Sequence, residues 1–320
     1  MINESRVRVG CYYFPNYHVD PRNEKIHGPG WTEWQLVRHA TPRFPDHQQP
    51  KVPFWGHEDE SKPEVMEQKI DAAVDHGIDH FLFDWYHYED GPFLERCLEQ
   101  GFLKARNVNR IDFALMWANH DWCNVHPMSR TFGKELLYPG RVSPKMFRFI
   151  TDLILDRYFS HPSYLKVDGC PYFSIYDLAK FVEIHGSVES TRKAIDGFRE
   201  RVRAAGFPDL HFNAVAWGKP VLPGEKVIRD LPQLIAALGF VGEQNGRGHF
   251  PGQHADQFPG QVMGIAHAAV HALSGIGRSE VCSVTGEQHT VDLPAFGDAG
   301  VKGVHGFTHD GDRCIALERA

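Results

Sequence analysis

Residues 80–86, HFLFDWY, form the stretch of sequence that decides the fold. Apolar side chains fill almost every position, which is typical of a strand buried on both faces of a parallel sheet. Pro63 opens an amphipathic pattern that runs to His76, and Gly77 follows as a helix stop, so a helix is predicted directly before this strand. Residues 113–118, FALMWA, repeat the strand pattern. The sequence therefore indicates strands and helices that alternate around residue 80.

The same alternation extends over the first 240 residues. Strands are predicted at residues 7–14, 80–86, 113–118, 171–176 and 211–217, and helices at residues 63–76, 94–106, 143–159, 188–205 and 231–238. These units make up about two thirds of an eightfold barrel. We therefore expect an α/β fold, a (β/α)8 barrel of the TIM type. A doubly wound sheet would give the same alternation, but polar and aromatic residues follow the strands without a glycine-rich phosphate loop, which favours the barrel.

Residues 241–320 have a different composition. All seven Trp and all ten Tyr of the chain precede residue 240, whereas fourteen of the thirty Gly and seven of the twenty His lie after it. Three more βα units are not recognisable there, so we expect a barrel that is incomplete or atypical beyond about residue 240. We divide the chain into a barrel portion, residues 1–240, and a Gly/His-rich C-terminal segment, residues 241–320. Three explanations of this segment are open: a mobile appendage, a separate small subdomain, or a changed reading frame.

The overall composition argues against several classes of partner. The chain has 320 residues, 42% of them apolar, with a net charge of −7 and a pI near 6.3. Binding of nucleic acid or of an anionic membrane needs clustered Lys and Arg. No stretch approaches the ~20 apolar residues of a membrane span, and the first residues lack the apolar core of a secretory signal. The six Cys show no CxxC spacing, which indicates reduced thiols. We therefore expect a cytoplasmic protein without a membrane span.

Aromatic, amide and carboxylate side chains gather directly after the predicted strands. In a barrel the carboxyl ends of the strands meet at the face that carries the active site. Indole rings stack on the C–H faces of a pyranose, while amides and carboxylates pair with its hydroxyl groups, so this mixture suits a glycan. The expected substrate-binding residues are Tyr12, Trp31, Trp34, Trp85, Trp117, Asn119, His120 and Trp122. The expected catalytic carboxylates are Glu33, Asp84 and Asp121, because glycosidic cleavage needs an acid and a base or nucleophile.

Several of these residues also have a structural interpretation. Trp85 and Trp117 lie within or beside apolar strands and suit the barrel core equally well. Asp84 is equally suited to a structural hydrogen bond in the barrel mouth. His87, His120 and Asp121 could meet as metal ligands, but the sequence has no HExxH motif and no Cys/His quartet. We therefore expect neither a metal nor a cofactor.

Several motifs together resemble one known family. They are VGCYYFPNYH at residues 9–18, GWTEW at 30–34, TPRFPDHQQP at 41–50, HGIDHFLFDWYHY at 76–88 and FALMWANHDW at 113–122. In this order, and over about residues 7–240, the chain resembles WbsX-type proteins. These are described as polysaccharide-biosynthesis glycosyltransferases with a domain similar to glycoside hydrolase family 99, the endo-α-mannosidase-like family. The resemblance implies a (β/α)8 barrel that acts on a glycan, mannose-containing glycans included, without a metal.

The chain departs from the family pattern in two places. Such families have WANE after the third strand, where this chain has His120, with Asp121 one position later. The family's Trp-flanked pair of glutamates, which resembles a catalytic pair, is not found in the C-terminal segment, which contains no Trp. The expected function is hydrolysis or transfer of glycosyl units, in polysaccharide biosynthesis. The alternatives are a non-catalytic or truncated relative that only binds glycan, and an unrelated metal-dependent barrel hydrolase.

The segment after residue 240 is expected to be the first target of limited proteolysis. It has few aromatic side chains with which to bury apolar area, and its glycines raise the entropic cost of ordering the backbone. Mass spectrometry of early fragments should place the first cuts within residues 241–320. First cuts within residues 7–240 would show instead that the C-terminal segment is a packed part of the fold.

Overall fold

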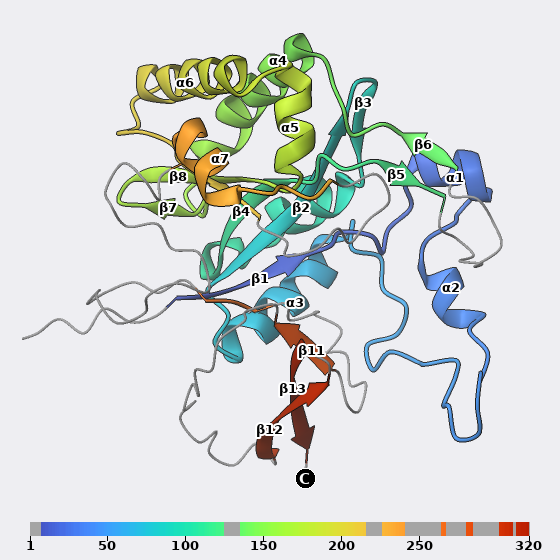
Figure 1. The fold of residues 1–320 in the computed structure, drawn as a ribbon. Coiled ribbons are helices and arrows are strands. Elements are labelled where there is room, and N and C mark those ends of the chain that lie inside the picture. Colours follow the sequence, from blue (N-terminus) through green and yellow to red (C-terminus); the bar gives the residue numbers. More distant parts are fainter. Residues whose placement is uncertain are drawn as a thin grey trace, which may run out of the picture.

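The computed structural model describes residues 8–124, 135–215 and 226–240, together with four stretches of strand in the C-terminal segment. Figure 1 shows the central sheet and, apart from it, a small sheet made by β11 to β13. The strands are β1 (Val9–Tyr13), β2 (His80–Tyr88), β3 (Gly91–Phe93), β4 (Asp112–Trp117), β5 (Trp122–Cys123), β6 (Leu136–Tyr138), β7 (Lys166–Val167), β8 (Cys170–Ile175), β9 (His211–Ala214), β10 (Gly264–Ala266), β11 (Glu280–Ser283), β12 (Val301–His309) and β13 (Asp312–Arg319).

The main strands of the central sheet are parallel and follow the order of the chain. β1 pairs with β2, β2 with β4, β4 with β8 and β8 with β9, all in parallel register. β10 pairs in parallel with the other edge of β1, where the last strand of a barrel would lie. A doubly wound sheet would reverse its strand order near the middle. The described strands show no such reversal, and their order is that of a barrel.

The sheet is curved, with Tyr12 and Tyr172 on its concave face. Their strands, β1 and β8, are separated by β2 and β4, so a flat sheet would hold them about 14 Å apart at the usual spacing of about 4.8 Å. Burial raises the pKa of Tyr12, and the nearby Tyr172 and Asp84 raise it further, which agrees with the closer approach that a curved sheet allows. The α/β fold with a parallel central sheet is confirmed, and its curvature agrees with a barrel.

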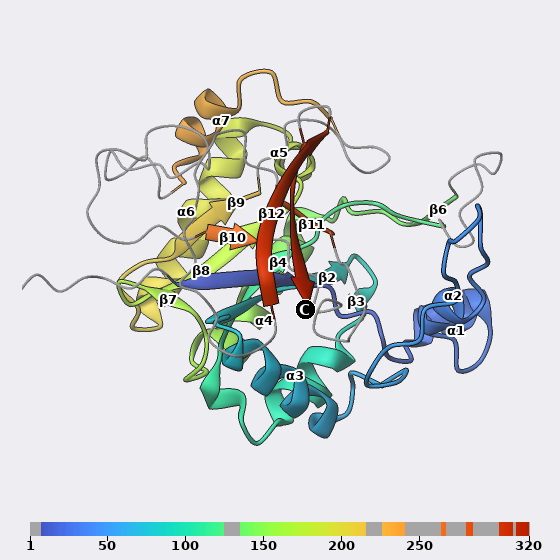
Figure 2. The ribbon, with the colours of Figure 1, turned by 90° about the horizontal axis from the view of Figure 1, so that it is seen from below.

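The helices that cover the convex side of this sheet are α3 (Pro63–Asp75), α4 (Pro144–Ile154), α5 (Leu178–His185), α6 (Val188–Ala204) and α7 (Leu231–Leu238), with the π-helical or 3-10 turns η1 (Cys97–Gly101), η2 (Phe102–Lys104), η3 (Val108–Arg110) and η4 (Leu155–Phe159). Two short helices, α1 (Pro21–His27) and α2 (Trp34–Arg38), lie in the long loop between β1 and α3. Figures 1 and 2 show α5 to α7 grouped together and α3 on a different side of the sheet. Helices that wrap around a curved sheet are expected to lie in this way.

Capping residues place the helix ends close to where the sequence predicts them. Ser143 precedes Pro144 at the start of α4, and its Oγ accepts a hydrogen bond from Met146 N at 3.1 Å. α3 begins at Pro63, as predicted. α7 ends at Gly239, whose φ of 67° lies in the left-handed region that glycine adopts without strain. The predicted strands are likewise confirmed to within two residues, apart from the end of the fifth, which lies outside the described residues.

Residues 94–106 do not form the single helix that the pattern predicted. A π-helical turn at Cys97–Gly101 is followed by a 3-10 turn. The turn passes close to the long loop before α3: a Cβ added at Gly101 would lie 2.1 Å from the carbonyl oxygen of Glu60. The short helices α1, α2 and α5 were also not predicted, because so few residues show no clear period. Most of the C-terminal segment lies outside the described residues, so the boundary at residue 240 stays a prediction.

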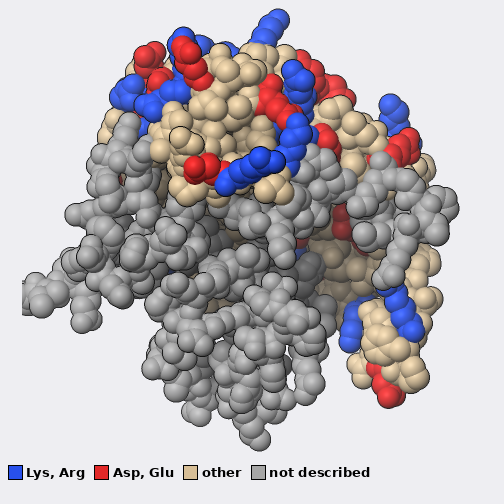
Figure 3. Space-filling model, in the orientation of Figure 1, with Lys and Arg blue, Asp and Glu red and all other residues tan. Residues whose placement is uncertain are grey.

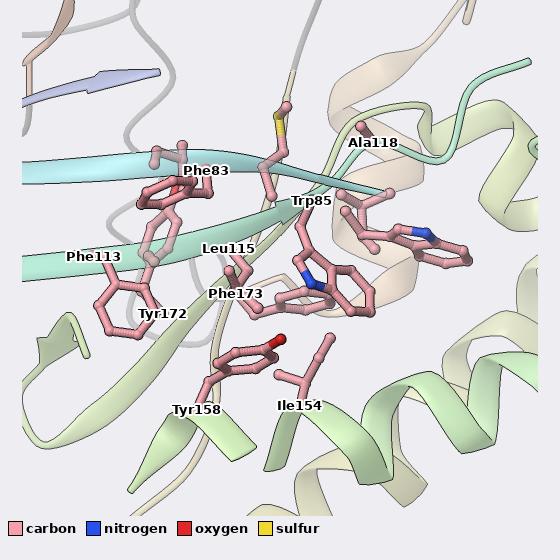
Figure 4. Close-up of a cluster of buried hydrophobic side chains, with 14 of the residues drawn as sticks. Phe83, Trp85, Phe113, Leu115, Ala118, Ile154, Tyr158, Tyr172 and Phe173 are labelled. Atoms are coloured by element: carbon pink, nitrogen blue, oxygen red, sulfur yellow. The ribbon is translucent and has the colours of Figure 1, made fainter. Parts of the chain in front are cut away.

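Aromatic side chains on the convex face form the core. Phe113 of β4 is 0% exposed, and its ring lies 5.3 Å from Phe102 and 5.1 Å from Tyr164, between ring centroids. Figure 4 shows Phe83, Phe113 and Phe173 of three neighbouring strands in this layer, together with Tyr158 from the helical side. Rings at edge-to-face angles fill the space between sheet and helices, so the core fixes how the helices lie on the strands.

Gly10 makes room for a buried histidine at the amino end of the concave face. Gly10 pairs with His80 in the register of β1 and β2, and a Cβ at Gly10 would lie only 1.9 Å from His80 Nε2. His80 is 4% exposed, and burial lowers its pKa to about 4. A neutral imidazole therefore fills the floor of the sheet, opposite the ends at which ligands bind in barrels.

Charged side chains of both signs are mixed over the face visible in Figure 3. Ion pairs one helical turn apart, such as Arg148 with Asp152 and Lys193 with Glu189, join side chains of opposite sign. The expectation that nucleic acid is not a partner stays a prediction. In the part of the chain that the structure describes, none of the helices is long and apolar enough to cross a bilayer.

Replacing Phe113 by Ala should lower the free energy of unfolding by about 3–5 kcal/mol, because the cavity lies among rings that cannot collapse into it. Phe149 on α4 is 52% exposed and serves as the matched control. Phe149→Ala should cost less than about 1 kcal/mol. Urea unfolding followed by circular dichroism measures both. Equal losses in the two variants would contradict the placement of Phe113 in the core.

Candidate active site

Five aromatic rings meet at the carboxyl ends of the central strands. They belong to Phe14, Tyr86, His120, Trp122 and Tyr176, and we call them the aromatic cluster. The centroid of the Tyr86 ring lies 5.4 Å from that of Trp122 and 5.6 Å from that of His120, and Tyr176 lies 5.2 Å from His120. Phe14 lies 6.2 Å from Tyr86 and is 38% exposed. Residues far apart in sequence meet here because parallel strands end at one edge of the sheet.

Asp84 lies on the concave face of β2, two residues before Tyr86. Side chains alternate along a strand, so these two share a face, whereas Trp85 points to the helices. Oδ1 of Asp84 is buried and has no hydrogen-bond partner among the residues that the structure describes. Burial raises the pKa of Asp84 to about 8. The carboxyl group is therefore mostly protonated at neutral pH and can donate a proton.

A polar row crosses the concave face at the level of Asp84. The register places Asp84 beside Met116, Met116 beside Ser174 and Ser174 beside Asn213. Ser174 is 0% exposed, and Asn213 Nδ2 donates to the hydroxyl of Tyr172 at 2.6 Å. With Asp84 protonated, every polar group of this row is uncharged. Such a surface offers donors and acceptors to the hydroxyl groups of a neutral ligand.

Glu33 reaches the same end of the sheet from the long loop between β1 and α3. Its Oε2 accepts a hydrogen bond from Asn16 Nδ2 at 2.5 Å, and Asn16 is a buried residue just beyond β1. Burial raises the pKa of Tyr86, and both Asp84 and Glu33 raise it further. The two carboxyl groups therefore both lie within electrostatic range of the Tyr86 hydroxyl.

The polar side chains of Asn119 and Asp121 join neighbouring elements. Asn119 Nδ2 donates to the carbonyl of Asp177 at 2.8 Å, and Asn119 Oδ1 accepts from Asp177 N at 2.7 Å. Asp121 Oδ2 lies 2.9 Å from Lys180 Nζ, and its Oδ1 accepts from Gly140 N at 2.8 Å. These contacts tie the end of β4 to the end of β8. Asn119 and Asp121 therefore have a structural role beside the aromatic cluster.

Trp85 and Trp117 pack on the convex side of the sheet, where the sequence left a core role open. They are 5% and 0% exposed. Trp85 faces Tyr158 of η4, and Trp117 stacks against Phe147 of α4 with its Nε1 donating to the carbonyl of His87. A glycan could reach neither ring unless a helix moved away. We therefore leave both out of the proposed glycan surface.

Trp31 and Trp34 lie in the long loop and have different surroundings. Trp34 is 9% exposed, stacks on Tyr17 at 3.7 Å between centroids, and donates from Nε1 to the carbonyl of Glu58 at 2.7 Å. Its packing role is thus accounted for. Trp31 is partly exposed and stacks on His27 at 4.2 Å. Of the two, Trp31 keeps a ring surface that a ligand can reach.

Among the described residues, no three His, Cys, Asp or Glu side chains are grouped so that they could hold a metal ion. His87 faces Phe149 of α4, whereas His120 belongs to the aromatic cluster, so the set considered from the sequence is not assembled. Sequence reasoning missed Ser174 and Tyr176, because the strand that contains them was recognised by its apolar pattern alone. Ser174, a polar residue inside an apolar strand, was the sign in the sequence that this strand contributes to a site.

Asp84→Asn should change the pH dependence of stability. Between about pH 4, the unfolded pKa, and about pH 8, the folded chain holds a proton that the unfolded chain has lost, so stability falls as pH rises, by at most about 1.4 kcal/mol per pH unit. Asn has the shape of a neutral Asp but does not titrate, so the variant lacks this fall in stability with rising pH. The free energy of unfolding of the variant minus that of the wild type should therefore grow from pH 5 to pH 8. A difference independent of pH would contradict the buried, protonated carboxyl.

Comparison with known proteins agrees with the motifs. The family model of glycosyltransferase WbsX matches residues 9–231. The uncharacterized protein WxcX of Xanthomonas campestris pv. campestris, strain B100, is 30% identical over 170 residues, 52% of this chain and 23% of that protein, and WxcX of a second strain gives the same values. The chain thus spans about a quarter of the length of these relatives.

Solved structures of low sequence identity also resemble the chain. The GH99 endo-alpha-mannosidase from Bacteroides thetaiotaomicron is 15% identical with a TM-score of 0.40, over 73% of this chain and 59% of that one. A glycoside hydrolase-like protein is 15% identical with a TM-score of 0.38, over 67% and 52%. The resemblance inferred from the sequence motifs is confirmed by the family match: the chain belongs to the WbsX glycosyltransferase family.

Proposed function

We propose that the chain binds a neutral glycan across the aromatic cluster and there hydrolyses or transfers a glycosyl unit, with Asp84 as proton donor and Glu33 as the second carboxylate. The single observation that carries this is the placement of the Asp84 carboxyl group, with its buried Oδ1 unpaired among the described residues, on the concave face at the end of the sheet that carries the aromatic cluster. Membership of the WbsX family supports a carbohydrate-active enzyme, and we extend the proposal to a role in polysaccharide biosynthesis.

Phe14 and Trp122 are the partly exposed rings of the aromatic cluster, whereas Tyr86, His120 and Tyr176 are buried. The centroid of the Phe14 ring, which is 38% exposed, lies 6.3 Å from that of Trp122, so the two rings are neighbours. The C–H face of a pyranose stacks on such rings, and its hydroxyl groups meet the uncharged polar row beneath. A charged ligand would find no opposite charge in that row, which favours a neutral glycan over a sugar phosphate.

Asp84 and Glu33 are suited to different steps of glycosyl transfer. Protonated Asp84 can deliver its proton to the oxygen of the leaving group as the glycosidic bond breaks. Glu33, which already accepts a hydrogen bond from Asn16, can act on the anomeric carbon or on the incoming hydroxyl group. A carboxylic acid that donates a proton and a second carboxyl group are the usual pair for this chemistry.

Binding without turnover is the second candidate function. Asp121, which follows the position where the family has a glutamate, is held in an ion pair with Lys180 and receives a backbone hydrogen bond. If that position supplies an essential carboxylate in catalysis, this chain lacks it. The aromatic cluster does not depend on Asp121 for its rings, so glycan affinity would persist.

Two variants separate binding from catalysis. Neutral oligosaccharides, with mannosides among them, should change the intrinsic Trp fluorescence of the wild type, and Trp122→Ala should weaken binding about tenfold, since it removes a stacking face. Asp84→Asn should leave affinity within about threefold and lower turnover by ~10²- to 10⁴-fold, the range for loss of a general acid. Fluorescence titration and a reducing-sugar or transfer assay measure the two effects.

Phe149→Ala, an exposed ring on a helix, is the matched control and should bind like the wild type. Glycan binding by the wild type without any turnover would establish the second candidate function. Full turnover in Asp84→Asn would refute the role of Asp84, and a wild type that binds no member of a broad glycan array would refute the proposal as a whole.

A further inference from the structure

The two ends of the long loop between β1 and α3 meet beside the sheet. Residues 14–62 contain α1 and α2, and Figure 1 shows them extending from the side of the central sheet. Tyr17 lies near the start of this loop and Glu60 near its end. Glu60 N donates to the carbonyl of Tyr17 at 3.0 Å, and Tyr17 N donates to Glu60 Oε2 at 2.9 Å. We call these two contacts the loop neck.

The Glu60 carboxylate of the loop neck belongs to a buried charged cluster. Glu60 is 2% exposed, and its Oε1 accepts from Lys69 Nζ at 2.5 Å and from the Tyr13 hydroxyl at 2.7 Å. Burial alone would raise the pKa of Glu60, but the Lys69 ammonium and the hydrogen bonds outweigh it and lower the pKa. Glu60 therefore stays ionised. Apolar side chains of similar volume would stabilise a fold at least as well as a buried ion pair, so stability alone does not account for the cluster.

The loop neck holds Glu33 and Trp34 from two sides. On one side the Tyr17 ring stacks on Trp34 with an interplanar angle of 17°, and the preceding Asn16 donates to Glu33. On the other side the carbonyl of Glu58 accepts from Trp34 Nε1. Any shift of the loop neck therefore moves Trp34, and Glu33 with it.

We propose that Glu60, supported by Lys69 and Tyr13, is a positioning residue that closes the loop neck and so fixes Glu33 at the end of the sheet. The carboxylate serves three donors at once, from β1, from α3 and from the loop backbone. An apolar group of the same size would fill the space but give Tyr17 N no acceptor. These contacts support the part of the proposal that concerns the positions of Trp34 and Glu33. The effect on glycan turnover rests in addition on the proposed function.

Two double variants test this without leaving a buried charge unpaired. Glu60→Leu/Lys69→Met replaces the pair by apolar side chains and removes the acceptor for Tyr17 N. Glu60→Gln/Lys69→Met removes the same charges but keeps a carbonyl oxygen that can accept from Tyr17 N. Both should fold, since buried ion pairs tolerate apolar replacement. Any difference between them therefore reports on the loop neck and not on the loss of charge.

The readout is 19F NMR of the full chain labelled with 5-fluorotryptophan, with the Trp34 resonance assigned by Trp34→Phe. We expect the Trp34 resonance to shift or broaden in the Leu/Met variant and to stay near its wild-type position in the Gln/Met variant, while the resonance of buried Trp117 is unchanged in both. Asp209→Asn, which removes the partner of buried Arg199, is the matched control and should leave Trp34 unchanged. Equal Trp34 resonances in the two double variants, or the same shift in Asp209→Asn, would overturn the proposal.

Turnover gives a second and separate readout. With a glycan that the wild type converts, the Leu/Met variant should lose at least tenfold in turnover and the Gln/Met variant less than threefold. A wild type that neither binds nor converts any glycan would sink the proposed function. The NMR comparison would still decide whether Glu60 positions Trp34, so the two failures are distinguishable.

Discussion

Burial of the central strands on both faces is the constraint on which the rest of the structure depends. β2 is buried at eight of its nine positions, with helices on one side and the concave interior on the other, and the ninth residue, Asp84, is half-buried with its Oδ1 atom out of contact with solvent. A charge in such a place costs far more than a neutral polar group. The raised pKa of Asp84 follows from this constraint, because the carboxyl group avoids the cost by keeping its proton. The property that makes Asp84 a suitable acid is thus a consequence of the fold.

The rim around the aromatic cluster is held by paired polar side chains. Asn119 satisfies both backbone groups of Asp177, and Asp121 is paired with Lys180, so the ends of β4 and β8 cannot separate without leaving buried polar groups unsatisfied. These same residues look like ligand-binding or catalytic side chains in the sequence. Their contacts show that residues with a structural role and residues of the aromatic cluster can occupy neighbouring positions after a strand.

The loop between β1 and α3 carries the Glu33 carboxylate. Much of this loop is irregular, so regular secondary structure alone does not fix the position of Glu33. Hydrogen bonds of Asp20 and Arg22 tie the part around α1 to β3 and the residue after it, and the two ends of the loop meet at Tyr17 and Glu60. The loop neck, with a buried ion pair behind it, gives those ends a fixed separation. Loops that carry function are generally held by such rigid neighbours.

The sequence by itself determined the five main strands, most of the longer helices with their caps or terminal glycines, their alternation, and the family. Periodicity and capping chemistry are local, and the motifs lie within single segments. The tertiary structure alone decided which face each residue of a strand occupies. In β2 and β4 nearly every residue is apolar, so no polar alternation distinguishes the helix side, where Trp85 and Trp117 lie, from the concave side, where Asp84 lies. The roles of Asp121 and Glu60 likewise required the structure, because their partners Lys180 and Lys69 come from other elements, and a contact between elements has no signature in local sequence.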